Sequence, residues 1–347
     1  MPLKLDNKTP FSCAHPPMLA ANGANILRFI VRATYDVGPK GLGLAESQAP
    51  IRFEDVPWGE AGKSSLRYES DVSLDKPLVD LLVNGRAYTP KGRAATETSV
   101  GLMFQGRFLK QLRVMGDRQW HYGLGGWKIT DPKPFLSMPL TYDRAFGGMD
   151  DLGSEARNRV GMGYTTKTGS HLEGMPVPNV EFVDEQVKSP TDRPAPAGLG
   201  ILNRDWKDRL KYAGTYDDRW LANRFPLLPD DFDMRFNQSA PESQWLRGVA
   251  GGEAIRVVGM TPDGVLGFSI PRGSVRLSLH YRQRSDEKIM PLDSILIDCE
   301  RRQVELTWRA IADTHGDPFQ LETMIVNTDS PELTSTDSGR PPNSEAA

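Results

Sequence analysis

Residues 26–37 read ILRFIVRATYDV, a run in which apolar and polar side chains largely alternate. Apolar residues occupy one set of alternate positions: Leu27, Phe29, Val31, Ala33, Tyr35 and Val37. The other set carries Arg28, Arg32, Thr34 and Asp36, with Ile30 as its apolar exception. Successive side chains of a β-strand point to opposite faces, so a period of two indicates a strand with one apolar face. We therefore expect a half-buried strand here, within a mainly β protein.

The same pattern extends outward on both sides of the chain. Further strand candidates lie at residues 41–48, 66–69, 79–88, 95–104 and 107–115, with turn signals such as Asn84-Gly85 between them. Alternation returns in residues 275–282 and 304–309, and residues 253–311 are predicted to form a meander of about five strands. The predicted fold class is mainly β, with antiparallel sheets in sandwich-like layers, a loop-rich centre and a few short helices.

The chain divides into three regions and a tail. Residues 1–122 form an N-terminal β-rich region, residues 123–252 a loop-rich centre with short helices, and residues 253–326 a C-terminal meander. Within the centre, helices are expected at residues 203–212 and 216–223. The polar composition of residues 327–347 predicts a disordered tail. Whether the β regions make one domain or two stays open.

Composition limits the partners and the compartment. The 347 residues carry 45 acidic and 42 basic side chains, a net charge of −3, which does not favour nucleic acid. No run of about 18 apolar residues and no signal peptide are present, so we expect no membrane insertion and a cytoplasmic protein. Cys13 and Cys299 stand far apart, which indicates neither a disulfide framework nor a metal site.

Two phrases in the centre mix a phenol, carboxylates, guanidinium groups and large rings with glycine. They read LTYDRAFGG (residues 140–148) and GTYDDRW (residues 214–220), and the second leads into FPLLPDDFD (residues 225–233). Such mixtures are typical of hydrogen-bonded loops or recognition surfaces. The candidate partner-binding or loop-bracing residues are Tyr142, Asp143, Arg144, Phe146, Gly147, Gly148, Tyr216, Asp217, Trp220, Asp231, Phe232 and Asp233. For Asp143, Arg144 and Asp217, bracing is the favoured role.

An enzymatic alternative rests on the acids of these phrases. Two of Asp143, Asp217, Asp231 and Asp233 could cleave a glycosidic bond if their carboxyl groups converged at about 5 to 10 Å. Turn capping explains the same residues without a reaction. The five histidines lack metal-ligand spacing, and no nucleophile or nucleotide-binding motif is complete. The sequence therefore predicts no catalytic, cofactor-binding or metal-binding residues, with a carbohydrate-active hydrolase as the alternative.

An ordered set of short motifs spans roughly residues 20 to 310. It comprises Lys76-Pro77, Asp80, residues 85–87, Pro90, residues 114–120, residues 140–148, Trp206, residues 214–220, residues 229–233, residues 236–240, residues 292–298 and Trp308-Arg309. This ordered set resembles a family of uncharacterised-domain proteins encoded in type VI secretion clusters of Gram-negative bacteria.

The resemblance implies a non-enzymatic adaptor or chaperone. Such a protein would hold a toxic effector, or a PAAR-containing cargo, and help to load it onto the VgrG spike. The expected partners are therefore proteins: the effector, the PAAR protein and VgrG. A structural component of the injected spike is a further possibility.

Overall fold

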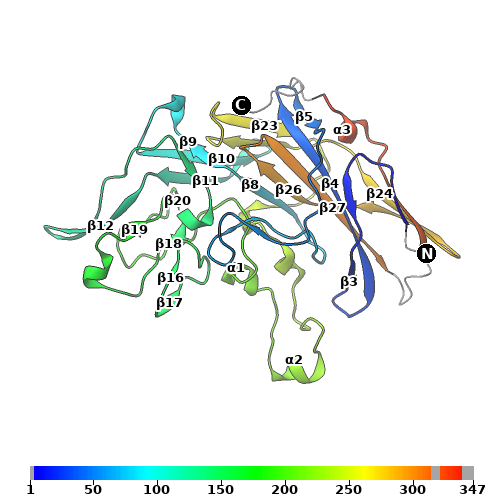
Figure 1. Cartoon of the computed structure of the whole chain (residues 1–347), viewed down its shortest axis with the longest axis horizontal. Coiled ribbons are helices and arrows are strands. Elements are labelled where there is room, and N and C mark those ends of the chain that lie inside the picture. Colours follow the sequence, from blue (N-terminus) through cyan, green and yellow to red (C-terminus); the bar gives the residue numbers. More distant parts are fainter. Residues whose placement is uncertain (1–3, 314–320, 338–347) are drawn as a thin grey trace.

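Strand β4 (Asn25–Gly38) runs through the largest sheet of the protein (Figure 1). The structure, a computed structural model, describes residues 4–313 and 321–337. The order of the large sheet is β2-β4-β27-β26-β8-β21, and β3 and β5 also pair with β4. Its other strands are β2 (Ser12–Ala14), β3 (Pro17–Leu19), β5 (Gly41–Leu44), β8 (Val79–Asn84), β21 (Trp245–Leu246), β26 (Leu292–Asp298) and β27 (Gln303–Asp313).

Two smaller sheets complete the main body. The five-stranded sheet is β20 (Val180–Phe182), β11 (Arg107–Met115), β10 (Glu97–Phe104), β22 (Ala254–Val258) and β23 (Val265–Ser269). The four-stranded sheet is β1 (Lys4–Asn7), β28 (Leu321–Asn327), β24 (Val275–Tyr281) and β25 (Ser285–Met290). Within the three main sheets, pairing is antiparallel except between β26 and β8 and between β1 and β28.

The central region carries short elements. Its small sheets are β13 (Gly126–Ile129), β12 (Arg118–Gly123) and β19 (Pro176–Val177); β14 (Ser137–Pro139) with β9 (Arg86–Tyr88); β15 (Phe146–Gly147) with β18 (Met162–Gly163); β16 (Met149–Asp150) with β17 (Gly153–Ser154); and β6 (Val56–Pro57) with β7 (Leu66–Tyr68). The α-helices are α1 (Lys207–Leu210), α2 (Asp218–Asn223) and α3 (Pro331–Thr334). The 3-10 helices are η1 (Pro90–Gly92), η2 (Tyr142–Arg144), η3 (Gly169–Leu172), η4 (Met234–Asn237) and η5 (Glu242–Gln244).

The predicted fold class is confirmed, since the protein is mainly β with antiparallel sheets and few short helices. Within residues 4–313 and 321–337, no helix combines the length and apolar character needed to cross a bilayer. The helix predicted at residues 203–212 is shorter than expected, because Asn203 precedes a turn and α1 begins only at Lys207.

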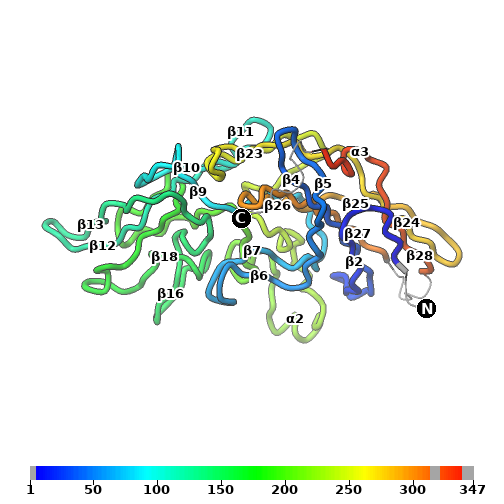
Figure 2. The backbone as a smooth tube through the Cα atoms, turned by 45° about the horizontal axis from the view of Figure 1, so that its top comes forward, coloured from blue at the N-terminus to red at the C-terminus, as the bar shows by residue number. Residues whose placement is uncertain are grey.

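One face of the large sheet contributes to a core that is shared by all three main sheets. Alternate residues of β4, including Phe29, Val31 and Tyr35, belong to one cluster with Leu112 of β11 and Leu277 of β24. Within the large sheet, Figure 2 shows β27 beside β4 although the two strands lie far apart in the sequence. The apolar residues of β4 therefore pack into the core that joins the three main sheets.

The polar residues of β4 are buried as well as its apolar residues. The prediction of a half-buried strand is therefore wrong. Every residue of β4 from Ile26 to Tyr35 is buried. Segments within residues 46–78 and 200–240 cover this face and carry charged side chains of their own. We term the combined set of charged side chains the ionic layer. On the sheet it comprises Arg28, Arg32, Asp80, Asp293, Glu305 and Arg309, and on the covering segments Arg52, Glu69, Asp71, Lys76 and Arg209.

The ionic layer is paired almost throughout. Arg52 forms a two-pronged ion pair with Glu305 at 2.7 and 2.6 Å. Asp71 pairs with Arg32 and also lies 3.4 Å from Arg309. Buried charges need such partners, because an unpaired charge removed from water is strongly destabilising. The polar side chains of β4 therefore face a second layer of protein rather than solvent.

The predicted C-terminal meander is wrong in its connectivity. Residues 253–311 contain three hairpins, and each hairpin belongs to a different main sheet. Strands β22 and β23 extend the sheet of β10, whereas β26 and β27 join β8 and β4. The N-terminal and C-terminal regions therefore share their sheets, because long-range pairing sets the neighbours of each strand.

The predicted disordered tail is wrong for residues 327–337. Leu333 of α3 is buried in the main core, and its carbonyl accepts a hydrogen bond from the Tyr35 hydroxyl at 2.9 Å. The backbone amide of Leu44 also donates to the carbonyl of Ser335. This one apolar anchor holds an otherwise polar segment against β5. Residues 338–347 lie outside the described residues.

The substitution Asp80→Leu tests the ionic layer. The Asp80 carboxylate is fully buried and accepts hydrogen bonds from Lys76 Nζ at 2.7 Å and from the backbone amides of Ser239 and Ala240 at 2.8 and 3.2 Å. Leucine would leave the ammonium group and both amides without their acceptor. We expect the free energy of unfolding, measured by urea denaturation, to fall by about 3–5 kcal/mol.

Glu60→Gln is the control for this substitution. Glu60 forms an exposed ion pair with Lys63 at 2.9 Å, and its loss should change the free energy of unfolding by less than about 0.5 kcal/mol. If the Asp80→Leu protein were as stable as the Glu60→Gln protein, the stabilising role of the buried Asp80 carboxylate would be contradicted.

Candidate functional site

The phrase at residues 140–148 lies inside the protein and connects distant segments. The ring of Tyr142 is buried and packs edge-on against Trp206, with 5.1 Å between ring centroids. A Cβ atom on Gly198 would lie 2.5 Å from the Tyr142 ring, so this close approach requires glycine. Asp143 accepts hydrogen bonds from the hydroxyl group and the backbone amide of Ser65. Tyr142 and Asp143 therefore join the phrase to three other parts of the chain.

The end of the same phrase wraps around one buried amide. Asn158 Nδ2 donates to the carbonyl oxygens of Tyr142 at 2.8 Å and Phe146 at 3.0 Å. A Cβ atom on Gly147 would lie 2.2 Å from the carbonyl oxygen of Asn158, and Gly148 adopts a φ of 111°. Both glycines are required by this tight path. Phe146 itself is buried in a small core with Trp120.

Arg144 also acts within the chain. Its guanidinium group donates to Asn179 Oδ1 at 2.9 Å and lies 3.4 Å from Asp117. The backbone amide of Asn179 in turn donates to the carbonyl of Arg144. The contacts of Asp143 and Arg144 are therefore loop-bracing contacts.

The second phrase forms a projection, which we term the aromatic lobe (residues 214–231). It carries α2 and extends away from the sheets (Figure 1). Its two ends meet at Gly214, where φ is 81° and a Cβ atom would lie 2.9 Å from Pro229 Cβ. Thr215 donates its backbone amide and its hydroxyl group to Asp231, at 2.9 and 2.8 Å. These contacts close the base of the lobe.

Hydrogen bonds also fix the interior of the lobe. Asp217 caps α2 by accepting from the backbone amide of Trp220 at 2.8 Å, and Trp220 Nε1 donates to the carbonyl of Leu227 at 2.9 Å. A Cβ atom on Gly23 would lie 2.6 Å from Leu227 Cδ2, so the lobe rests on the turn between β3 and β4. The lobe therefore has a defined shape although it stands apart from the sheets.

The outer surface of the lobe is aromatic. Tyr216 and Phe225 are 53% and 63% exposed, and Leu221 of α2 is 58% exposed. Trp220 lies between the two outer rings and packs edge-on against both, with centroids 4.7 Å from Tyr216 and 5.6 Å from Phe225. The result is one continuous group of rings that faces solvent, which we term the aromatic cluster: Tyr216, Trp220 and Phe225.

Phe232 and Asp233 follow the lobe at its base. The ring of Phe232 packs edge-on against Phe236 at 5.7 Å. Asp233 caps η4 and accepts from the backbone amide and the guanidinium group of Arg235. The hydrogen bond from the Arg235 side chain lowers the pKa of Asp233 below its usual value.

The four candidate acids do not meet as one set. Asp143 and Asp233 have the bracing contacts described above, whereas Asp217 and Asp231 line an open hollow of the lobe. Hydrogen bonds from the backbone amide and hydroxyl of Thr215 lower the pKa of Asp231, whereas a general acid needs a raised pKa. Across residues 4–313 and 321–337, no three acidic, histidine or cysteine side chains are arranged to hold a metal ion.

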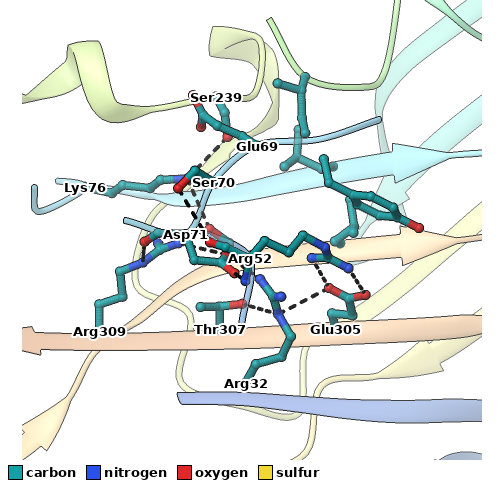
Figure 3. A pocket seen from close by; sticks show the side chains of 15 residues that line it. Arg32, Arg52, Glu69, Ser70, Asp71, Lys76, Ser239, Glu305, Thr307 and Arg309 are labelled. Carbon is teal, nitrogen blue, oxygen red and sulfur yellow. Dashed lines mark hydrogen bonds and ion pairs between the residues drawn. The ribbon is translucent and has the colours of Figure 1, made fainter. Parts of the chain in front are cut away.

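A second polar hollow lies in the ionic layer (Figure 3). Its cavity of about 40 Å³ has room for about one water molecule and is too small for a sugar ring. Burial by itself raises the pKa of Glu69, but the positive charges of Arg209 and Arg204 outweigh this effect and bring the pKa to about 2. The sequence analysis missed this group, although polar residues at alternate positions of β4 and β27 were its signal.

The comparisons with known proteins identify a family. Residues 22–309 match the family model described as an uncharacterized protein conserved in bacteria, DUF2169. The chain belongs to this family. No curated protein and no solved structure matches the chain. The matched range of this DUF2169 protein contains the whole ionic layer and the aromatic lobe.

The substitution Gly214→Ala tests the closure of the lobe. Alanine would meet Pro229 and Asp231 at 2.9 Å and would strain a backbone with positive φ. We expect the free energy of unfolding to fall by about 1–3 kcal/mol, and limited proteolysis to cleave residues 214–231 faster.

Gly248→Ala is the matched control for the lobe. Gly248 also has a positive φ, 63°, but nothing lies within 4 Å of an added Cβ atom. The Gly248→Ala protein should therefore lose some free energy of unfolding through backbone strain. Proteolysis should cleave its lobe no faster than the lobe of the wild-type protein. Equal effects of the two substitutions on cleavage would refute the proposed closure.

Proposed function

We propose that this protein is a non-enzymatic adaptor or chaperone of a type VI secretion system. It binds an effector or a PAAR-containing cargo and aids its loading onto the VgrG spike. Two observations support the proposal: the ordered phrases of the sequence resemble proteins encoded with such systems, and the aromatic lobe offers a surface suited to a protein partner. Because loading precedes secretion, the proposed place of action is the bacterial cytoplasm.

The single observation that carries the proposal is the exposed aromatic cluster. Large aromatic side chains supply much of the binding energy at protein interfaces, because they bury a large area and lose little conformational entropy. Exposing three adjoining rings to water without a partner is unfavourable. The hydrogen bonds of Asp217 and Asp231 hold these rings in one arrangement, so little ordering is needed on binding.

The charges around the cluster indicate the partner surface. The lobe carries four acids and two arginines: Asp217, Asp218, Asp230, Asp231, Arg219 and Arg224. Arg224 is already paired with Asp230 at 3.2 Å. The remaining excess of carboxylates favours an apolar groove with a basic rim on the cargo or spike protein.

The absence of turnover is part of the proposal. The four candidate acids have structural contacts in the folded chain, and a lowered pKa at Asp231 and Asp233 disfavours proton donation by either group. A binding role requires no proton transfer by these acids. Their hydrogen bonds instead fix the shape of the surface that carries the rings.

Affinity purification from the native host tests the function. The tagged protein, expressed at its natural level, should recover a VgrG, a PAAR protein or an effector that mass spectrometry identifies. The double substitution Tyr216→Ser and Phe225→Ser should lower that recovery at least about tenfold, since each lost hot-spot ring costs about 2 kcal/mol.

Leu124→Ser is the matched control, because Leu124 is 98% exposed at the tip of the β12–β13 hairpin. It should leave the recovery unchanged. Complexes that lack all three protein classes would refute the function, whereas recovery that survives the double substitution would refute the role of the lobe.

A further inference from the structure

A cavity of about 360 Å³ lies apart from the aromatic lobe, between the five-stranded sheet and the segment that follows α1. Its volume is in the range of small-molecule sites. Rings from three elements contribute to its walls: Phe182 of β20, Tyr212 after α1 and Trp245 of β21. Tyr212 and Trp245 lie 6.1 Å apart between centroids, so one end of the cavity is aromatic.

Lys110 of β11 lines this cavity with a buried side chain. The residue is only 7% exposed, and its Nζ donates one hydrogen bond, to the carbonyl oxygen of Gly198 at 2.9 Å. In the described part of the chain no carboxylate pairs with it. Burial lowers the pKa of Lys110 to about 7, and no acidic neighbour counteracts that effect. A buried amine without a counter-ion is costly in a folded protein.

The other cations that line the cavity already have acidic partners. They are Arg157 with Glu155, Arg209 with Glu69, Lys211 with Glu242, and Arg235 with Asp233. Lys110 is thus the cation of this lining that lacks an acid. The remaining titratable side chains of the lining are Asp208 and the hydroxyl groups of Tyr142 and Tyr212.

We propose that this cavity binds a small monocarboxylate with an aromatic or apolar body, whose carboxylate pairs with Lys110. One unneutralised cation matches one negative charge, whereas a phosphate would require further free donors. The body of the ligand then packs against Phe182, whose ring centroid lies 5.9 Å from Lys110 Nζ, and against Trp245. This site is independent of the proposed adaptor function.

Binding at this site has a protonation signature. At pH 8 the Lys110 amine of the unliganded protein is mostly neutral, because its pKa is about 7. A carboxylate beside the amine favours the ammonium form, so binding at pH 8 should take up close to one proton for each ligand bound. Loss of this uptake on substitution of Lys110 assigns the proton to its amine.

Isothermal titration calorimetry tests the proposal directly. The probes are benzoate, phenylacetate and indole-3-acetate, and their neutral amides serve as matched controls. At pH 8, titrations in buffers with different ionisation enthalpies give the number of protons taken up. At least one acid should bind the full chain while its amide does not, and Lys110→Met should weaken binding about tenfold or more.

Lys207→Met is the control variant, because Lys207 is exposed on α1 and does not line the cavity. It should bind the acid as the wild-type protein does. Lys110→Met is expected to fold, since methionine fits the same apolar surroundings, and circular dichroism checks this. Equal behaviour of acids and amides, including binding of neither, overturns the proposal, as does unchanged acid binding in Lys110→Met.

Discussion

The fold depends on the pairing of buried charges between the large sheet and the segments that cover it. The ion pair between Arg32 of the sheet and Asp71 of the covering segment, residues 46–78, is an example. Both side chains are buried, and the Asp71 carboxylate also accepts from the backbone amide of Arg52 at 2.7 Å. Charges in such surroundings are stable only when each has a partner in good geometry. The covering segments must therefore lie on the sheet in one register, which apolar contacts alone would not specify.

This constraint reaches the surfaces that are proposed to bind other molecules. Asp80 of the sheet holds Gln238 and the backbone amides of Ser239 and Ala240, just after the aromatic lobe. Arg209, shortly before the lobe, is held by Glu69 at 2.6 Å. The lobe thus leaves and re-enters the body at two points fixed by buried charges. Because both ends of the lobe are held in place, its rings project into solvent in one fixed direction.

Several features of this fold could be predicted from local patterns. The strands predicted at residues 26–37 and 107–115 correspond to β4 and β11, and the helix predicted at residues 216–223 corresponds to α2, which begins two residues later. The tight turn chemistry of residues 140–148 also corresponds to bracing contacts. Each of these features depends on neighbours in the sequence, so a short window contains the needed information.

Other features could not be predicted, because they depend on segments far away in the sequence. The polar residues of β4 indicated a polar face, but not that residues 46–78 would cover it. The three hairpins of residues 253–311 likewise belong to three different sheets. Lys110 shares a face of β11 with the buried Leu112 and Val114, and only the fold reveals that no acid of the described residues pairs with it. Long-range packing decides whether an alternating charge faces water or protein.

Hydrogen–deuterium exchange of an Asp71→Ala protein tests the role of the ionic layer most directly. If buried charges hold the cover onto the sheet, the backbone amides of residues 46–78 will exchange at least about tenfold faster than in the wild-type protein, because local opening becomes easier. The amides of β4 and β27, which are held by their own ladder, will keep their protection. Unchanged exchange in residues 46–78, or an equal rise throughout the chain, would contradict this account.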